Sequence, residues 1–283
     1  MTADPIRDIY NALLPKLIDE DMASYQLQSS KFLSSHKLAT FRDDSPELYK
    51  MEIDGKTEPF DTVAYAQGRG AHTLILEGRE VYDDTYTIGG LINPKTGKPY
   101  GRSTVKFLEW CEEENLDPEF VLTPSDHELN LNLWAGCMKN PEVVKILSEG
   151  VAEKVLRAEF HGVECQIRPD WTGPTHGFTN LKTTADLRWF EYDAKRKFNY
   201  IAGESFYRSV AHAATPELLH IPCTYIAVEK KPPYRAAVFE IDPEYLDAKE
   251  EINCEAIDRL IQCRETNFWP TGFEGMNVIK ETS

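Results

Sequence analysis

The chain has 283 residues, of which 41% are hydrophobic and 28% charged, as is typical of a globular protein with a substantial core in one large or two small domains. Its formal net charge of −16 excludes a protein that coats nucleic acid through overall charge, but not an enzyme that contacts phosphates in one local groove. The N-terminus lacks a basic segment followed by an apolar one, and no apolar run reaches membrane-spanning length. We therefore expect no signal peptide, no membrane partner and a soluble intracellular protein.

The cysteines are scattered along the chain without a CxxC pair, which predicts reduced and mostly buried thiols. A zinc site or metal cluster built from distant cysteines is an alternative that the spacing does not support. The six residues are Cys111, Cys137, Cys165, Cys223, Cys254 and Cys263.

The first part of the chain is predicted to be helical. Residues 1–60 contain short helical patterns broken by polar turns, and we expect them to form one compact unit with residues 61–283. The glycines and prolines of residues 93–102 exclude regular structure there. Further helices are predicted over residues 62–77, 103–114 and 125–148.

The sequence changes character after residue 150. A long amphipathic helix is predicted from Leu187 to Ile201, and a last helix over about residues 245–263. Strands, the first two joined by a hairpin turn at His161-Gly162, are predicted over residues 154–160, 163–167, 177–183, 223–229 and 235–241. This order predicts an α/β fold, in which a mixed β-sheet core is flanked by helices and preceded by a mostly helical N-terminal region.

Polar residues are predicted to converge at one edge of this sheet. Asp170 ends one predicted strand, and Asn180 and Lys182 lie two apart on the next, so that they point to the same face. Mg²⁺ needs oxygen ligands, which the Asp170 carboxylate, the Asn180 amide carbonyl and the Leu181 backbone carbonyl can supply. Lys182 can orient or help to deprotonate an attacking water and stabilise the charge that grows on a scissile phosphate. Alternatively, Asp170 caps a turn after Pro169, and Asn180 and Lys182 face solvent.

His72 is a second candidate for the same site. It lies four residues after Gly68 on a predicted helix, so the glycine leaves room beside the imidazole on the same helix face. A lone histidine on a helix is more often a structural or surface residue. Together with Asp170, however, it becomes a candidate metal ligand or orienting group.

These residues carry a family resemblance. The chain resembles the exodeoxyribonuclease VIII (RecE-like) branch of the PD-(D/E)xK nucleases in the pattern Gly68-x-x-x-His72, then Arg168-Pro169-Asp170, then Leu181-Lys182-Thr183-Thr184. Residues 227–234 also resemble that family, and residues 45–49 and 93–101 resemble its phage-borne members. The order and spacing of these short motifs over most of the chain make the resemblance specific.

The resemblance implies a restriction-endonuclease-like fold over residues 61–283, with digestion of double-stranded DNA from its ends in the 5′-to-3′ direction. Mg²⁺ is the implied metal and Mn²⁺ the second candidate. A homo-oligomer is also implied, with a single-strand annealing protein as partner in phage-type recombination, in the cytoplasm of a bacterium or phage-infected host. In this interpretation Lys182, Asp170 and His72 are catalytic, and the metal is held by Asp170, Asn180, Leu181 and His72.

Two local clusters of positive charge and one tyrosine are candidates for DNA contacts. The first cluster lies in and just after the turn-rich segment, and the second on the predicted amphipathic helix. Such clusters are also typical of a solvated face. The candidates are Lys95, Lys98, Arg102, Lys106, Lys195, Arg196, Lys197 and Tyr207.

Asn180 departs from the pattern of the family, which has a carboxylate at this position. The family also has a glutamine where this chain has Gly203, four residues before Tyr207. Because an amide brings no charge, we expect weaker binding of Mg²⁺ and little support for chemistry that uses two metal ions.

Two outcomes are open. In the first, another acid compensates, and the preferred candidate is Glu164, which lies six residues before Asp170 and is predicted on the same strand face. Glu77 and Glu204 are the other candidates. In the second, the chain is a catalytically weakened or inactive protein that binds DNA ends, or another partner, on the same fold.

Overall fold

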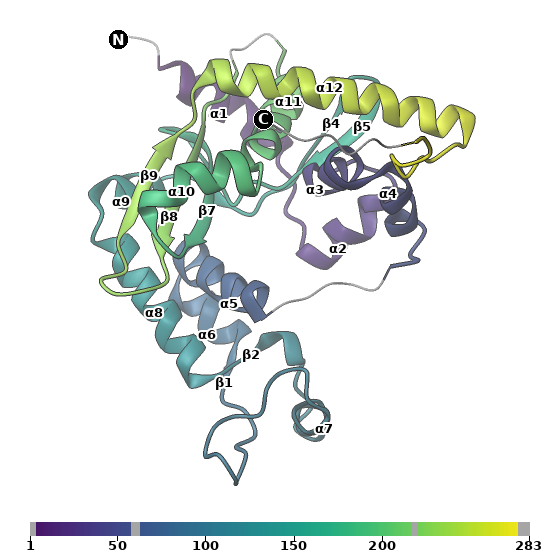
Figure 1. Cartoon of the computed structure of the whole chain (residues 1–283). Coiled ribbons are helices and arrows are strands. Elements are labelled where there is room, and N and C mark those ends of the chain that lie inside the picture. The colour runs from purple at the N-terminus through teal and green to yellow at the C-terminus, as the bar shows by residue number, and fades with distance from the viewer. Residues whose placement is uncertain (1–3, 58–62, 217–219, 277–283) are drawn as a thin grey trace, which may run out of the picture.

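The computed structural model describes residues 4–57, 63–216 and 220–276 (Figure 1). None of the helices in these ranges is long and apolar enough to span a membrane. The helices are α1 (Pro5–Leu13), α2 (Met22–Leu27), α3 (Ser35–Ala39), α4 (Pro46–Ile53), α5 (Val63–His72), α6 (Arg79–Thr85), α7 (Val105–Glu113), α8 (Pro124–Met138), α9 (Pro141–Leu147), α10 (Leu187–Tyr192), α11 (Tyr200–Ala214) and α12 (Pro243–Thr266). The strands are β1 (Thr87–Ile88), β2 (Val121–Leu122), β3 (Val151–Ala152), β4 (Leu156–Phe160), β5 (Val163–Ile167), β6 (Trp171–Gly173), β7 (Gly177–Thr184), β8 (Cys223–Glu229) and β9 (Ala236–Glu240).

The centre of the molecule is a mixed five-stranded sheet in the order β3-β6-β7-β8-β9. Strands β7 and β8 run parallel, and the other pairs are antiparallel. The parallel pair is joined by α10 and α11, which cross over one face of the sheet, as a parallel connection requires. This architecture confirms the predicted α/β class with helices on a mixed sheet.

Side chains alternate between two hydrophobic layers along β7 and β8. Phe178 and Tyr225 belong to a core shared with α10, α11 and α12, whereas Leu181 and Ile226 belong to a second core shared with α8 and α9. The segment that follows α5 contributes Ile75 to this second core. Because alternate residues of a strand share a face, Asn180 and Lys182 lie on the same face as Phe178, as predicted.

Strand β7 is longer than its neighbour β6, and this difference creates the edge on which the site is built. The β6–β7 ladder pairs Trp171 with Thr179 and Gly173 with Gly177, so it ends before Asn180. From Asn180 onward, β7 is paired with β8 but no longer with β6. The residue that precedes β6 on this open side is Asp170.

The N-terminal helices pack against the hairpin β4–β5 and the α11–α12 layer. Leu13, Leu38 and Phe41 are buried in the same core as Ile167 of β5 and Phe206 of α11. Backbone bridges join Ile18 to Val155 and Leu33 to Cys165. In Figure 1 these helices lie beside α12 and the hairpin, while α7, β1 and β2 form a projection below α5, α6 and α8.

Some predicted strands differ from the structure. The strands predicted over residues 154–160 and 163–167 form the hairpin β4–β5, with the turn at His161-Gly162 as expected, but this hairpin is a separate two-stranded sheet. Its place in the main sheet is taken by β3 and β6, which are two and three residues long. Strands this short carry no detectable alternation of polar and apolar residues, so the sequence pattern does not predict them.

Two predicted long helices are each interrupted. The helix predicted over residues 125–148 divides into α8 and α9, because Asn140 caps a new helix that has Pro141 at its first position. The helix predicted from Leu187 to Ile201 ends in a π-helical turn, and Asn199, with φ of 48°, begins α11 in a new direction. Phe198, predicted in the apolar stripe, is therefore 47% exposed.

The cysteine prediction is confirmed. All six cysteines are free thiols, and five of them are buried. Burial raises the pKa of Cys137 and of Cys165 to about 12, so these thiols stay protonated at neutral pH.

Substitution of Gly150 by alanine should destabilise the sheet edge near the site. A Cβ atom at Gly150 would lie 2.5 Å from Trp171 Nε1 and 2.6 Å from the backbone carbonyl oxygen of Thr172. We expect Gly150→Ala to lower the free energy of unfolding by about 1–3 kcal/mol, as overpacking does, measured by urea denaturation. Gly89→Ala is the control, since a Cβ there meets no atom within 4 Å; equal effects of the two substitutions would contradict the packing argument.

Candidate metal centre

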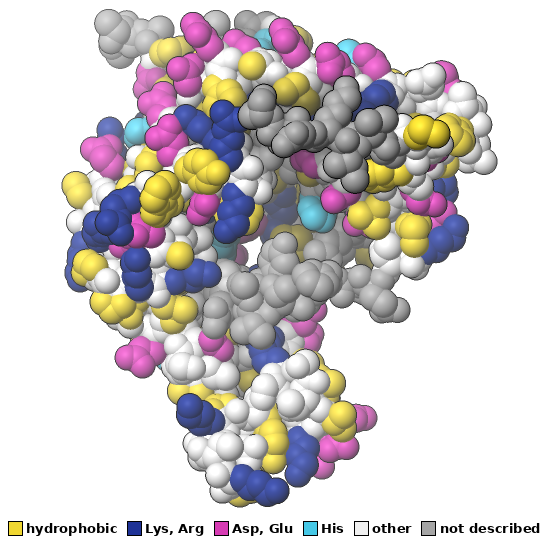
Figure 2. Space-filling model, viewed as in Figure 1, with side chains coloured by type: hydrophobic (Ala, Val, Ile, Leu, Met, Phe, Trp, Pro, Cys, Tyr) yellow, Lys and Arg dark blue, Asp and Glu magenta, His cyan; other side chains and the backbone are white. Residues whose placement is uncertain are grey.

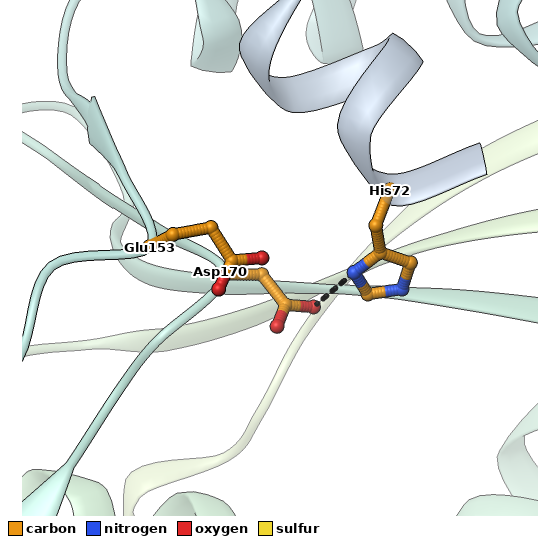
Figure 3. Close-up of side chains that lie close together, drawn as sticks. All are labelled: His72, Glu153 and Asp170. Carbon is orange, nitrogen blue, oxygen red and sulfur yellow. Dashed lines mark ion pairs between the residues drawn. The ribbon is translucent and has the colours of Figure 1, made fainter. Parts of the chain in front are cut away.

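Three side chains from distant parts of the sequence meet at the open edge of β7 (Figure 3). His72 comes from the end of α5, Glu153 follows β3, and Asp170 precedes β6. One ligand atom from each of the three lies within 4.8 Å of the other two. The His72 Nδ1 and Asp170 Oδ2 atoms are 3.5 Å apart. A group of one imidazole and two carboxylates at this spacing is suited to bind a divalent cation.

Asp170 is fixed to β7 by two hydrogen bonds that run in opposite directions. Its backbone N–H donates to Asn180 Oδ1 over 2.9 Å, and its carboxylate Oδ2 accepts the Leu181 N–H over 2.7 Å. The carboxylate therefore takes the place of the missing β6 residue beside Leu181. Because the N–H and C=O of one strand residue face the same neighbour, the Leu181 carbonyl also faces this edge, where the sequence predicts a ligand.

Glu153 is the acid that sequence reasoning missed. It has φ of 56°, and its N–H donates to the Asp170 carbonyl over 3.1 Å. Arg168 holds it from the other side, with Nη1 lying 2.8 Å from the Glu153 carboxylate and Nε donating to the Glu153 carbonyl over 3.0 Å. No motif or periodicity marks Glu153, which follows a strand of two residues.

Glu164, the preferred compensating acid, is placed elsewhere. It is exposed on β5, opposite Glu159 of the hairpin, and it does not belong to the His72 group. The prediction assumed that the strand continues to Asp170, but β5 ends at Ile167. Glu77 is exposed as well, although its charge acts to raise the pKa of Glu153.

His72 is held in its neutral form. Burial lowers its pKa below the usual value; Asp170 and the Leu181 backbone act to raise it, and Lys182 acts to lower it further. A neutral imidazole is the form that binds a metal. A Cβ at Gly68 would meet no atom of the described residues within 4 Å, in accordance with the predicted room on this helix face.

Lys182 carries its positive charge into the site. Burial acts to lower its pKa, but the charges of Asp170, Glu204, Tyr200 and Glu153 outweigh burial, and the net pKa is raised. Its Nζ lies 5.5 Å from the centroid of the Tyr200 ring. In the metal-free site a lysine in this state stays protonated at neutral pH, so it can stabilise negative charge.

Asn180 faces two partners. While its Oδ1 accepts from Asp170, its Nδ2 donates to both carboxylate oxygens of Glu204 on α11, each over 2.6 Å. Asn180 is 3% exposed and Glu204 4% exposed. The amide oxygen predicted as a metal ligand is thus already used by the Asp170 backbone.

Two of the acids have pKa values near or above neutrality. Burial, together with the charge of Asp170, raises the pKa of Glu153 to about 8 against the effect of Arg168. Burial also raises the pKa of Glu204 to about 7, although Lys182 and Asn180 act to lower it. Crowded carboxylates that retain protons near neutrality are typical of sites that exchange protons for a cation.

The predicted DNA-contact residues lie outside this group. Tyr207 is half-buried, and its hydroxyl donates to the Arg168 carbonyl over 3.3 Å, so it supports the Arg168–Asp170 segment. Most lysines of the two clusters are exposed, but Lys195 pairs with Glu191, and Arg102 donates to the Pro118 carbonyl. The first cluster, formed by Lys95, Lys98, Arg102 and Lys106, is on or near the projection that contains α7.

The fold agrees with comparisons to known proteins. The family model described as "PDDEXK-like domain of unknown function (DUF3799)" matches residues 34–282. The chain belongs to this family. It is therefore a member of the PD-(D/E)xK superfamily.

A crystal structure supports the same fold. The structure of a "Putative exonuclease" from Eubacterium rectale matches with a TM-score of 0.64 and 12% sequence identity, over 89% of this chain and 88% of that one. No curated protein sequence matches this PDDEXK-like chain. The family and the fold together suggest a nuclease.

The raised pKa of Glu153 predicts how the metal-free PDDEXK-like protein responds to pH. Between the ordinary value of 4.5 and about 8, the folded protein keeps a proton on Glu153 that the unfolded chain has lost. The free energy of unfolding should therefore fall as pH rises through this window. Glu153→Gln cannot titrate, so its unfolding free energy, measured by urea denaturation in EDTA, should fall less.

The comparison between the two proteins isolates Glu153. His72, whose pKa is lowered, has the opposite effect, because the folded state resists protonation as pH falls through the ordinary histidine range. His72 is present in both proteins, so its contribution largely cancels. Identical pH profiles of unfolding free energy for the parent and Glu153→Gln would contradict a raised pKa of Glu153 in the folded protein.

Proposed function

We propose that this protein is a metal-dependent exodeoxyribonuclease that digests linear double-stranded DNA from its ends, in the 5′-to-3′ direction. The observation that carries the proposal is the meeting of His72, Glu153 and Asp170 beside Lys182 at the open edge of β7, on a PD-(D/E)xK fold. Metal-assisted phosphodiester hydrolysis uses an anionic ligand set for a cation and a positive group for the phosphate. The site offers both.

In this proposal the metal ligands and Lys182 have separate roles. His72, Glu153 and Asp170 would hold Mg²⁺, or Mn²⁺, which as a Lewis acid stabilises charge on the phosphate oxygens and lowers the pKa of an attacking water. The Leu181 carbonyl is a further oxygen at the same edge. Lys182 stays protonated and stabilises the negative charge of the phosphate in the transition state.

The finer features of the proposed activity come from the resemblance to RecE-like nucleases. Double-stranded DNA ends are the proposed substrate, and a single-strand annealing protein in phage-type recombination is the proposed partner. We also propose a homo-oligomer that works in the cytoplasm of a bacterium or phage-infected host. The exposed lysines of the two basic clusters, in a chain with net charge −16, are the local groups available for phosphate contacts.

One observation favours a second function, a protein that binds DNA ends without cleaving them. Asn180 brings no charge to the site, and its Oδ1 already accepts the Asp170 N–H. If the metal needs a further acid on β7, the site would bind DNA but turn over slowly or not at all. Binding of duplex ends without loss of DNA in Mg²⁺ or Mn²⁺ would favour this function over the exonuclease.

Substitution of Lys182 should separate cleavage from folding. With linear duplex DNA and Mg²⁺, we expect Lys182→Ala to reduce the rate of nucleotide release by about 10²–10³-fold, as for the loss of one group that stabilises transition-state charge. Closed circular duplex should resist the parent protein, because an exonuclease needs an end. Substrates labelled at the 5′ or 3′ terminus report the direction. Equal rates for the parent and Lys182→Ala would show that the site is wrongly assigned.

The basic clusters can be tested through the salt dependence of binding. Replacement of Lys95, Lys98 and Lys106 by alanine should lower the slope of log affinity against log salt by about 0.9 for each phosphate that these lysines neutralise. Fluorescence anisotropy with a labelled duplex in Ca²⁺ or EDTA measures binding without cleavage. The matched comparison replaces Lys195, Arg196 and Lys197. An unchanged slope in both variants would exclude both clusters from the DNA interface.

A further inference from the structure

The side chain of Asn180 can adopt only one orientation in this site. The Asp170 backbone N–H, 2.9 Å from Oδ1, can only donate, so it requires the amide oxygen on its side. The amide nitrogen is then directed at Glu204, whose two carboxylate oxygens each lie 2.6 Å from Nδ2. Asn180 therefore connects Asp170 at the edge of the sheet to Glu204 on α11.

Glu204 is a buried carboxylate with a defined set of neighbours. It is 4% exposed, and the charges of Lys182 and Asp170 both act on it. A buried carboxylate is stable only when hydrogen bonds and opposite charge replace the lost water. Asn180 supplies two hydrogen bonds, the Tyr225 hydroxyl acts in the same direction, and Lys182 supplies the opposite charge.

We propose that Asn180 and Glu204 act as one carboxamide–carboxylate unit, in which Glu204 supplies from α11 the negative charge that β7 lacks at residue 180. Glu204 is a positioning residue in this unit. Through the Asn180 amide it fixes Asp170, and through its charge it orients Lys182. Its effect on metal binding rests on the proposed function, whereas the pairing of the two side chains does not.

The unit has a simple physical requirement, namely one amide and one carboxylate. Two carboxylates at this separation would repel one another in a buried site, and two amides would remove the negative charge that Glu204 adds to that of Asp170 near Lys182. The opposite arrangement, with an acid at 180 and an amide at 204, meets the same requirement. An aspartate at 180 would still accept a hydrogen bond from the Asp170 N–H. A glutamine at 204 would donate a hydrogen bond to that aspartate at 180.

Four proteins test the unit: the parent, Asn180→Asp, Glu204→Gln and the double variant. Their side chains at positions 180 and 204 have nearly the same shape and differ in charge. Thermal unfolding in EDTA at neutral pH is the first measurement. We expect each single substitution to lower the unfolding midpoint, and the double variant to recover most of the loss. If Asn180→Asp does not fold at all, a folded double variant supports the unit equally. Midpoint losses that simply add in the double variant would overturn it.

Calorimetric titration with Mn²⁺ alone is the second measurement. Glu204→Gln should weaken Mn²⁺ binding by ~10-fold or more, as the loss of a group that orients metal ligands does, and the double variant should recover affinity. Glu251→Gln, at an exposed residue of α12, controls for the loss of one carboxylate. Equal Mn²⁺ affinity in the parent and Glu204→Gln would overturn the charge role of Glu204.

The two proposals fail in distinguishable ways. If the parent does not degrade DNA but the double variant restores stability and Mn²⁺ binding, the nuclease function fails and the unit is supported. If the parent degrades DNA but the losses are additive, the unit fails and the nuclease function stands.

Discussion

Asp170 and strand β7 hold one another through two hydrogen bonds, and the other groups of the site take their positions from this contact. Leu181 is fully buried, so its N–H would cost about 1–3 kcal/mol if it had no partner. Strand β6 is too short to provide one, and the Asp170 carboxylate does so instead. A backbone requirement of the sheet thus places a carboxylate at its edge. The Asp170 carbonyl then receives the Glu153 N–H, and α5 brings His72 to the other side of the carboxylate.

Glu153 has a strained backbone conformation, and contacts with neighbouring residues compensate its cost. A left-handed conformation costs a residue other than glycine on the order of 1–3 kcal/mol, and it persists only where surrounding contacts determine it. For Glu153 these contacts are the N–H bond to Asp170 and the two bonds from Arg168. Tyr207 in turn holds the Arg168 carbonyl, and so α11 supports the segment from which Asp170 projects. Figure 3 shows the three side chains directed toward one another, and the face drawn in Figure 2 is hollowed near its centre.

The sequence predicts the elements whose patterns are long and regular. Strands β5, β7 and β8 and helix α12 lie within a few residues of their predicted ranges, since period-2 and period-3.6 patterns need several residues to be detected. The pattern also predicts that Asn180 and Lys182 share a face, and the proximity of His72 and Asp170 agrees with the predicted convergence. Glu153 could not be predicted, because its position depends on a two-residue strand and on tertiary contacts with Arg168. Strand periodicity predicts Glu164 on the same face as Asp170. This prediction is wrong, because β5 ends at Ile167 and the periodicity does not continue to Asp170.

The raised pKa values of Glu153 and Lys182 share one contribution, the charge of neighbouring carboxylates, which burial reinforces at Glu153 and opposes at Lys182. Glu153, Asp170 and Glu204 outnumber the cationic side chains Arg168 and Lys182 in a partly dehydrated space. Burial together with this negative charge makes Glu153 retain its proton, and the negative charge makes Lys182 retain its own against the effect of burial. A proton on Glu153 reduces the repulsion among the carboxylates but removes a metal ligand. A divalent cation reduces the same repulsion and leaves every carboxylate able to act as a ligand. His72, held neutral, adds a nitrogen ligand without adding positive charge. The charge balance of the site is therefore suited to a small divalent cation, and in the proposed function Lys182 would hold its positive charge for an anionic substrate.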